Sequence, residues 1–154
     1  MEISELLTPK RVISNLRVTS KKQALQDLAK RAANLTGVHE RSIFDVLLER
    51  ERLGTTGVGN GIAIPHGKLS NMDRLYGLFA RLERPVAFDS IDEQPVDLIF
   101  MLLAPETAGA DHLKALAQVS RLLRDPKVCE KLRGTESSDG LFALLTDSAA
   151  SRAA

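Results

Sequence analysis

The chain has 154 residues, of which 44% are hydrophobic and 27% charged, a composition typical of one globular domain and not of a collagen-like or disordered chain. Its net charge of +1, with no basic block, argues against a non-specific electrostatic hold on nucleic acid. No apolar run approaches the roughly 20 residues that span a bilayer, and the N-terminus lacks the features of a signal peptide. The one cysteine, Cys129, excludes an internal disulfide and favours a cytoplasmic location.

Apolar spacing predicts the elements of the first third of the chain. Ser20 followed by Gln23 matches a capping box, and apolar side chains then recur at helical spacing until Gly37 provides a stop. A second helical pattern ends in a run of charged residues before Gly54. The predicted elements are a strand or extended lead-in within residues 1–19, a helix over 20–36, and a helix over 39–53 that carries Arg50 near its end.

A glycine-rich segment follows this second helix. Four glycines fall within the nine residues 53–61, so the backbone is expected to turn tightly there. The apolar residues 62–64 then predict a short strand. Pro65 and Gly67 interrupt the pattern on both sides of His66, because proline removes a ladder donor and glycine lets a ligand approach the main chain. His66 is therefore expected at the end of a strand.

The second half of the chain alternates between strands and helices. Residues 96–104 are apolar enough to form a central strand covered on both faces, and Asp111 is expected to cap a helix that holds His112 in its first turn. Helices flanking mixed strands predict a layered α/β/α sandwich around a mixed sheet of about five strands, as one domain over 1–147 with a disordered tail at 148–154. The predicted elements are strands over 74–83 and 96–104 and helices over 111–124, 126–132 and 139–146.

Of the three histidines, His66 is the strongest candidate for chemistry. His39 begins a polar helical segment and is interpreted as a solvated side chain. Amides of a glycine-rich turn beside His66 could bind an anion such as phosphate, although a hairpin with a buried, satisfied histidine explains the same glycines. Arg50 and His112 are ordinary surface residues when taken alone. If they converge on His66, their positive charge keeps its imidazole neutral and able to attack phosphorus.

The glycine-rich segment also carries a family resemblance. Residues 53–68, LGTTGVGNGIAIPHGK, closely resemble the phosphorylation-site segment of enzyme IIA domains of the mannitol and fructose class in the bacterial phosphoenolpyruvate phosphotransferase system. Because the chain reads as a lone domain, it is most similar within that class to the nitrogen-regulatory enzymes IIA. The resemblance covers most of residues 1–147 and includes LERE at 48–51, AFDSID at 87–92, PVDL at 95–98 and DHL at 111–113.

The resemblance implies a phosphotransferase component that works through a phosphohistidine, without a cofactor or a metal. By residue match, His66 receives phosphate from the histidine-containing phosphocarrier protein of the nitrogen branch, His112 stabilises the phosphohistidine and Arg50 binds phosphate. It further implies a cytoplasmic regulator of partners such as potassium-transport proteins or sensor kinases, with no membrane insertion and no nucleic acid. The matching loop residues, expected to bind phosphate, are Gly59, Asn60, Gly61 and Gly67.

Three alternatives remain open from the sequence. The domain could be a freestanding sugar-specific enzyme IIA, of the fructose or mannitol type, that passes phosphate to a IIB domain. It could be a pure binding module in which His66 is never phosphorylated. A zinc site from His66, His112 and a carboxylate such as Glu49 or Asp111 is the third, although no known ligand spacing is present.

Overall fold

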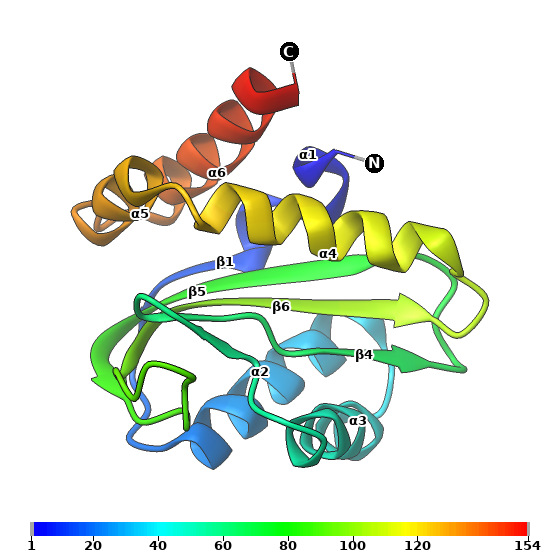
Figure 1. Cartoon of the computed structure of the whole chain (residues 1–154). Coiled ribbons are helices and arrows are strands. Elements are labelled where there is room, and N and C mark those ends of the chain that lie inside the picture. Colours follow the sequence, from blue (N-terminus) through cyan, green and yellow to red (C-terminus); the bar gives the residue numbers. More distant parts are fainter. Residues whose placement is uncertain (1, 154) are drawn as a thin grey trace.

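A computed structural model describes the backbone of residues 2–153 and the side chains of residues 2–147 (Figure 1). The chain alternates between helices and short and long strands. In order, its elements are α1 (Ile3–Leu6), a 3₁₀ turn (Pro9–Arg11), β1 (Val12–Leu16), α2 (Lys21–Thr36), α3 (Glu40–Arg52), β2 (Gly57–Gly59), β3 (Ile62–Ala63), β4 (His66–Leu69), β5 (Tyr76–Val86), β6 (Val96–Pro105), α4 (Ala110–Leu123), α5 (Pro126–Arg133) and α6 (Ser138–Ala153).

One mixed, six-stranded sheet forms the middle layer, with strand order β1-β5-β6-β3-β2 and β4 also paired to β6. The β1/β5, β3/β6 and β4/β6 pairs are parallel, whereas β5/β6 and β2/β3 are antiparallel. The predicted α/β/α sandwich is thus confirmed. The sheet has six strands, where about five were expected, because β2 and β4 are short segments in which no alternation of apolar residues marks a strand.

Helices cover both faces of the sheet, and each face has its own apolar core. In Figure 1, α2 and α3 lie below the sheet, and α1, α4, α5 and α6 lie above it. Alternate side chains of β6 enter the two cores, as a pleated strand requires. Ile99, Met101 and Leu103 pack with α2 and α3, whereas Leu98, Phe100 and Leu102 pack with the opposite helices. The prediction that residues 96–104 form a central strand is confirmed.

Helix boundaries follow local capping chemistry, with one correction. The Ser20 side chain accepts a hydrogen bond from the Gln23 amide, and Gly37 ends α2 in the left-handed conformation, as predicted. His39 is exposed and caps α3, with its Nδ1 accepting from the Arg41 amide. The prediction that Asp111 caps α4 is wrong. Gly109, with φ of 56°, occupies the cap position, because its backbone conformation is one that glycine adopts readily.

A second correction concerns His66, which begins a strand instead of ending one. Strands β3 and β4 pair with successive parts of β6, and the intervening Pro65 keeps contact with β6 through its carbonyl, which accepts from the Leu102 amide at 2.9 Å. Proline interrupts the strand, yet the segments before and after it both stay paired with β6. The helix predicted over 139–146 is longer in the structure, where α6 continues to Ala153, and the predicted disorder of residues 148–154 stays a prediction.

Candidate functional site

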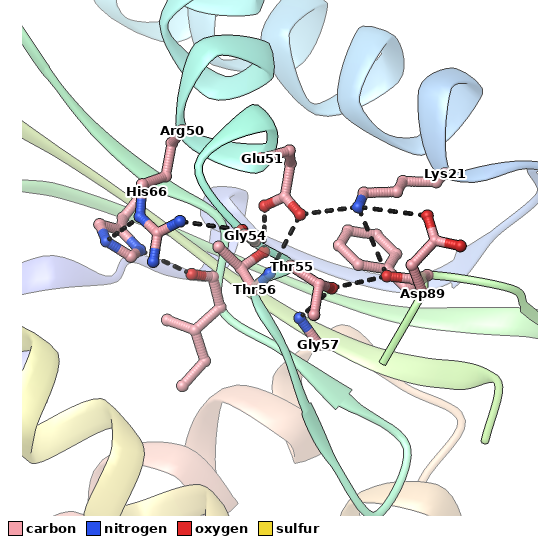
Figure 2. A network of polar contacts seen from close by, with 11 residues as sticks. Lys21, Arg50, Glu51, Gly54, Thr55, Thr56, Gly57, His66 and Asp89 are labelled. Carbon is pink, nitrogen blue, oxygen red and sulfur yellow. Dashed lines mark hydrogen bonds and ion pairs between the residues drawn. The ribbon is translucent and has the colours of Figure 1, made fainter. Parts of the chain in front are cut away.

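His66 lies at the first position of β4, a strand that pairs on one side with β6. Its Nδ1 lies 2.8 Å from the Ile64 carbonyl oxygen, and its Nε2 accepts a hydrogen bond from Nε of Arg50 at 3.2 Å (Figure 2). A carbonyl only accepts, so Nδ1 carries the proton. These two contacts define a neutral ring with the Nε2 lone pair directed at the guanidinium.

The surroundings of His66 favour this neutral form. Burial lowers the pKa of His66 below its ordinary value of 6.5, and the positive charge of Arg50 lowers it further. The hydrogen bond to Ile64 and the negative charge of Glu51 oppose the shift. Because the net change is downward, the ring is uncharged at neutral pH and its Nε2 is available as a nucleophile.

Arg50 reaches the site from the last turn of α3. Its Nη1 donates to the Gly54 carbonyl at 2.9 Å, which anchors the guanidinium to the chain just beyond the helix. The remaining nitrogen, Nη2, makes no hydrogen bond to any residue whose side chain is described. A guanidinium held in this way beside a nucleophilic nitrogen can bind the oxygens of a phosphoryl group through several donors.

His112 approaches from the opposite face of the sheet, in the first turn of α4 as predicted. Its ring centroid lies 5.8 Å from that of His66, at an interplanar angle of 66°. The side chain is only 6% exposed, and its Nε2 has no hydrogen-bond partner among the described residues. Burial, followed by the charges of His66 and Lys68, lowers the pKa of His112. The structure thus brings together the three side chains that the sequence singled out.

The predicted loop residues have different surroundings. Asn60 and Gly61 form the two-residue turn between β2 and β3, both with positive φ, as expected for an Asn-Gly hairpin. The Asn60 amide donates to Asp92 at 2.9 Å, and its carbonyl accepts from Arg133 at 2.6 Å. Gly59 precedes this turn. Phosphate binding by Gly59, Asn60 and Gly61 stays a prediction, and these hydrogen bonds of the turn run to the β5/β6 connection and to α5.

Gly67 has a packing role in the structure. A Cβ built on this residue would overlap the Cγ1 atom of Val46 in α3. The absence of a side chain therefore allows α3 to lie directly against β4. This close approach brings Arg50, on α3, within hydrogen-bond distance of His66, on β4.

Replacing Gly67 by alanine is expected to destabilise the fold by about 1–3 kcal/mol, because overpacking forces neighbouring groups apart. Urea unfolding followed by circular dichroism measures this change. Gly134→Ala is the matched control, since a Cβ there meets only ordinary contacts at 3.6 and 3.8 Å. Equal stabilities of the two variants would show that α3 moves freely to accommodate the methyl group.

A buried polar network beside the site was not predicted from the sequence (Figure 2). Glu51 pairs with Lys21 at 2.8 Å, and its side chain is 4% exposed. The alternating charges at the end of α3 resemble a solvated helix end, which hid this role. A signal was present, however, because Glu51 falls on the same helical face as the buried Phe44 and Leu47.

The zinc hypothesis gains no support from the geometry. Within residues 2–147, no group of three or more His, Cys, Asp and Glu side chains could hold a metal ion. Glu49, one of the proposed carboxylate ligands, is 75% exposed and pairs with Arg52. In addition, none of the described helices is both long and apolar enough to cross a membrane.

Comparisons with known proteins identify the family of the chain. The family model described as phosphoenolpyruvate-dependent sugar phosphotransferase system, EIIA 2, matches residues 5–148. A nitrogen regulatory protein of Bradyrhizobium diazoefficiens is 57% identical over 145 residues, which cover 94% of this chain and 95% of that protein. The nitrogen regulatory protein of Escherichia coli K12 is 41% identical over 148 residues, with coverages of 96% and 91%.

Solved structures show the same fold. The crystal structure of nitrogen regulatory protein IIA-Ntr from Neisseria meningitidis has a TM-score of 0.89 at 34% identity, covering 94% of this chain and 99% of that one. The crystal structure of mannitol IIA from Escherichia coli shares the fold, with a TM-score of 0.76 at 23% identity over 90% of this chain and 98% of that one. The resemblance noted in the sequence is thereby confirmed. The chain belongs to the EIIA 2 family of the phosphoenolpyruvate-dependent sugar phosphotransferase system, where it is similar to the nitrogen regulatory proteins.

Proposed function

We propose that His66 accepts a phosphoryl group from the histidine-containing phosphocarrier protein of the nitrogen branch, and that phosphorylation regulates binding to partners in nitrogen and potassium metabolism. The observation that carries this proposal is the unprotonated Nε2 of His66 facing the Arg50 guanidinium. The names of the similar nitrogen regulatory proteins support a regulatory outcome. The regulatory targets are potassium-transport proteins or sensor kinases, and the exchange takes place in the cytoplasm.

In the proposed transfer, the lone pair of His66 Nε2 attacks phosphorus in line with the departing nitrogen of the carrier's phosphohistidine. The new phosphorus–nitrogen bond forms as the old one breaks, and the bonding electron pair returns to the carrier's imidazole ring. His66 keeps its Nδ1 proton, which the Ile64 carbonyl holds throughout. Since a phosphorus–nitrogen bond is exchanged for another of the same kind, the step needs no cofactor and no metal.

The protein's contribution is to position the ring and to neutralise charge. Charge on the transferring group is spread over three equatorial oxygens, and Arg50 lies where its donors can reach them. Before transfer, Nε of Arg50 donates a hydrogen bond to the lone pair of His66 Nε2. Arg50 must therefore move toward the phosphoryl oxygens as the new bond forms. The anchor between Nη1 and Gly54 keeps it near the site during this exchange.

Incubation with phosphorylated carrier, followed by intact mass measurement, tests the proposal. A gain of one phosphoryl group supports it, and no gain would leave a pure binding module. Subsequent addition of a fructose-type IIB domain separates regulation from sugar transport. This second arm matters because a fructose-specific EIIA component of Haloferax volcanii is 36% identical to this chain. Retention of the phosphoryl group supports regulation, and rapid loss to the IIB domain would assign a sugar-specific role.

His112 is expected to matter more after transfer than before it. Its buried Nε2 has no hydrogen-bond partner in the part of the chain that the structure describes, and it lies at a helix N-terminus, where partial positive charge favours a dianion. We expect His112→Ala to accept phosphate on His66 but to hold it for a shorter time. His112→Gln, which keeps a side-chain donor, should recover part of the lifetime.

The measurement compares phosphohistidine hydrolysis and back-transfer to the carrier in the wild type and both variants at one pH. His39→Ala is the matched control, because His39 is exposed and caps α3. If all four proteins lose phosphate at the same rate, His112 has no part in the transfer.

A further inference from the structure

Glu51 follows Arg50 directly in the chain and forms an ion pair with Lys21. This ion pair is not used in the transfer described above. Figure 2 shows Arg50 directed to His66 and Glu51 directed to Lys21 from the same end of α3. Residues adjacent in a helix point about 100° apart, so each can serve a different neighbour. A carboxylate this deeply buried requires a partner and hydrogen bonds to compensate its lost hydration.

The Glu51 carboxylate is fully engaged. Besides Lys21, it accepts a hydrogen bond from the Thr56 amide at 3.0 Å and a short one from the Thr56 hydroxyl. Thr56 itself is 3% exposed. Both donors of one residue are thus fixed by one side chain, which sets the path of the backbone as it leaves α3.

Thr56 is connected to the ring of His66 by two hydrogen bonds through Ile64. The Thr56 carbonyl accepts from the Ile64 amide at 3.0 Å, and the Ile64 carbonyl in turn holds Nδ1 of His66 at 2.8 Å. On the other side of the ring, Arg50 holds Nε2 and is anchored to Gly54, within the same short segment. Both nitrogens of His66 are therefore oriented by groups that depend on the residues between 50 and 56.

Lys21 extends the restraint to a third segment. Its ammonium donates to the Phe88 carbonyl at 3.4 Å, lies 3.7 Å from Asp89, and stands 4.9 Å from the centre of the Phe88 ring. The Thr55 hydroxyl donates to the same Phe88 carbonyl at 2.7 Å. The loop after α3 is consequently held between α3 itself and the β5/β6 connection.

We propose that Glu51 is a positioning residue for the phosphoryl transfer, acting through Thr56 and Ile64 on the orientation of the His66 ring. This inference rests on the function proposed above. Glu51 does not touch the phosphoryl group. Its contribution is to the alignment of Nε2 with the incoming phosphorus, which affects the rate within the complex of the two proteins and not their association.

The test uses Glu51→Gln and Thr56→Val in the full chain. Glu51→Gln removes the charge opposite Lys21. Thr56→Val removes only the hydroxyl donor and keeps the shape of the side chain. This second variant therefore tests the proposal even if Glu51→Gln does not fold. Glu49→Gln is the matched control, an equal change on an exposed residue of the same helix turn. We expect both test variants to transfer phosphate about tenfold more slowly at saturating carrier, with KM unchanged. The control should behave as the wild type.

A readout that does not need the carrier keeps this inference separate from the proposed function. In NMR titration of the free protein, Glu51→Gln should lower the pKa of His66, because Glu51 is a negative charge that raises it against Arg50. Thr56→Val should shift the ring nitrogen resonances, and Glu49→Gln should change neither. If the wild type takes no phosphate, the proposed function fails, and the ring signals of Thr56→Val decide on the positioning role, because the pKa change in Glu51→Gln follows from its charge alone. Wild-type rates or ring signals in the folded test variants, or a change confined to KM, would overturn the positioning role.

Discussion

His66→Ala is expected to gain no phosphoryl group when it is incubated with the phosphorylated carrier. The reason is geometric, because His66 combines an unprotonated Nε2, a lowered pKa and an adjacent guanidinium. His112, in contrast, is 6% exposed, and a carrier protein cannot reach it without displacing neighbouring groups. Intact mass measurement before and after incubation gives the result directly.

The chemistry of the label provides an independent check. A phosphoryl group on the imidazole of His66 should be lost in acid and retained in base, as expected for a phosphorus–nitrogen bond. His39→Ala should be labelled as fully as the wild type. A complete phosphoryl equivalent in His66→Ala, with His112 modified, would reverse the roles of the two histidines. A label that survives acid would instead indicate a hydroxyl acceptor.

Arg50→Ala is expected to slow transfer about tenfold to a hundredfold, since a charge-assisted hydrogen bond to phosphate is worth about 1.5–3 kcal/mol. The protein should remain folded, because the lost hydrogen bond to the Gly54 carbonyl contributes only about 1 kcal/mol. Arg50→Lys should recover little activity, as an ammonium cannot contact both Gly54 and the ring through a planar fork. Rapid-quench measurement of phosphohistidine formation distinguishes these rates.

Arg52→Ala is the matched control for Arg50. Both arginines lie in the last turn of α3, but the Arg52 side chain is 67% exposed and pairs with Glu49 at 3.5 Å. Its removal should leave the transfer rate unchanged. Equal slowing in the two variants would mean that general positive charge at this helix end attracts the carrier. A wild-type rate in Arg50→Ala would leave Arg50 as an ordinary surface residue.

Long elements could be predicted from the sequence because burial on one face repeats along them. The helix α2 has both its cap and its stop in the sequence, and β6 is apolar except for Asp97. The strands β2 and β4 could not be predicted, since they contain only three and four residues; β2 pairs with the neighbouring β3, and β4 is held by the distant β6. Local preference gives little information where tertiary contacts determine the conformation.

The candidate site was predictable to a different degree for each residue. His66 was singled out by its glycine-flanked position, and the family resemblance then assigned roles to it, to Arg50 and to His112; the fold explains how residues so far apart in the chain meet. The glycines of this region were predicted to bind phosphate, yet in the structure Gly67 allows α3 to pack directly on β4. Glu51 was not predicted because the charged end of α3 hid its place on the apolar helical face, and because its partner Lys21 lies 30 positions earlier in the chain.

His66 is contacted from both helical layers. Arg50 lies on α3, below the sheet, and His112 lies on α4, above it (Figure 1). Each layer has its own apolar core, so each could open locally while the other stays folded. A phosphoryl group bound by both side chains would act as a cross-link between these two cooperative units. Phosphorylation would then reduce partial unfolding on both sides of the sheet, and a partner could detect it as a change in rigidity far from the phosphate.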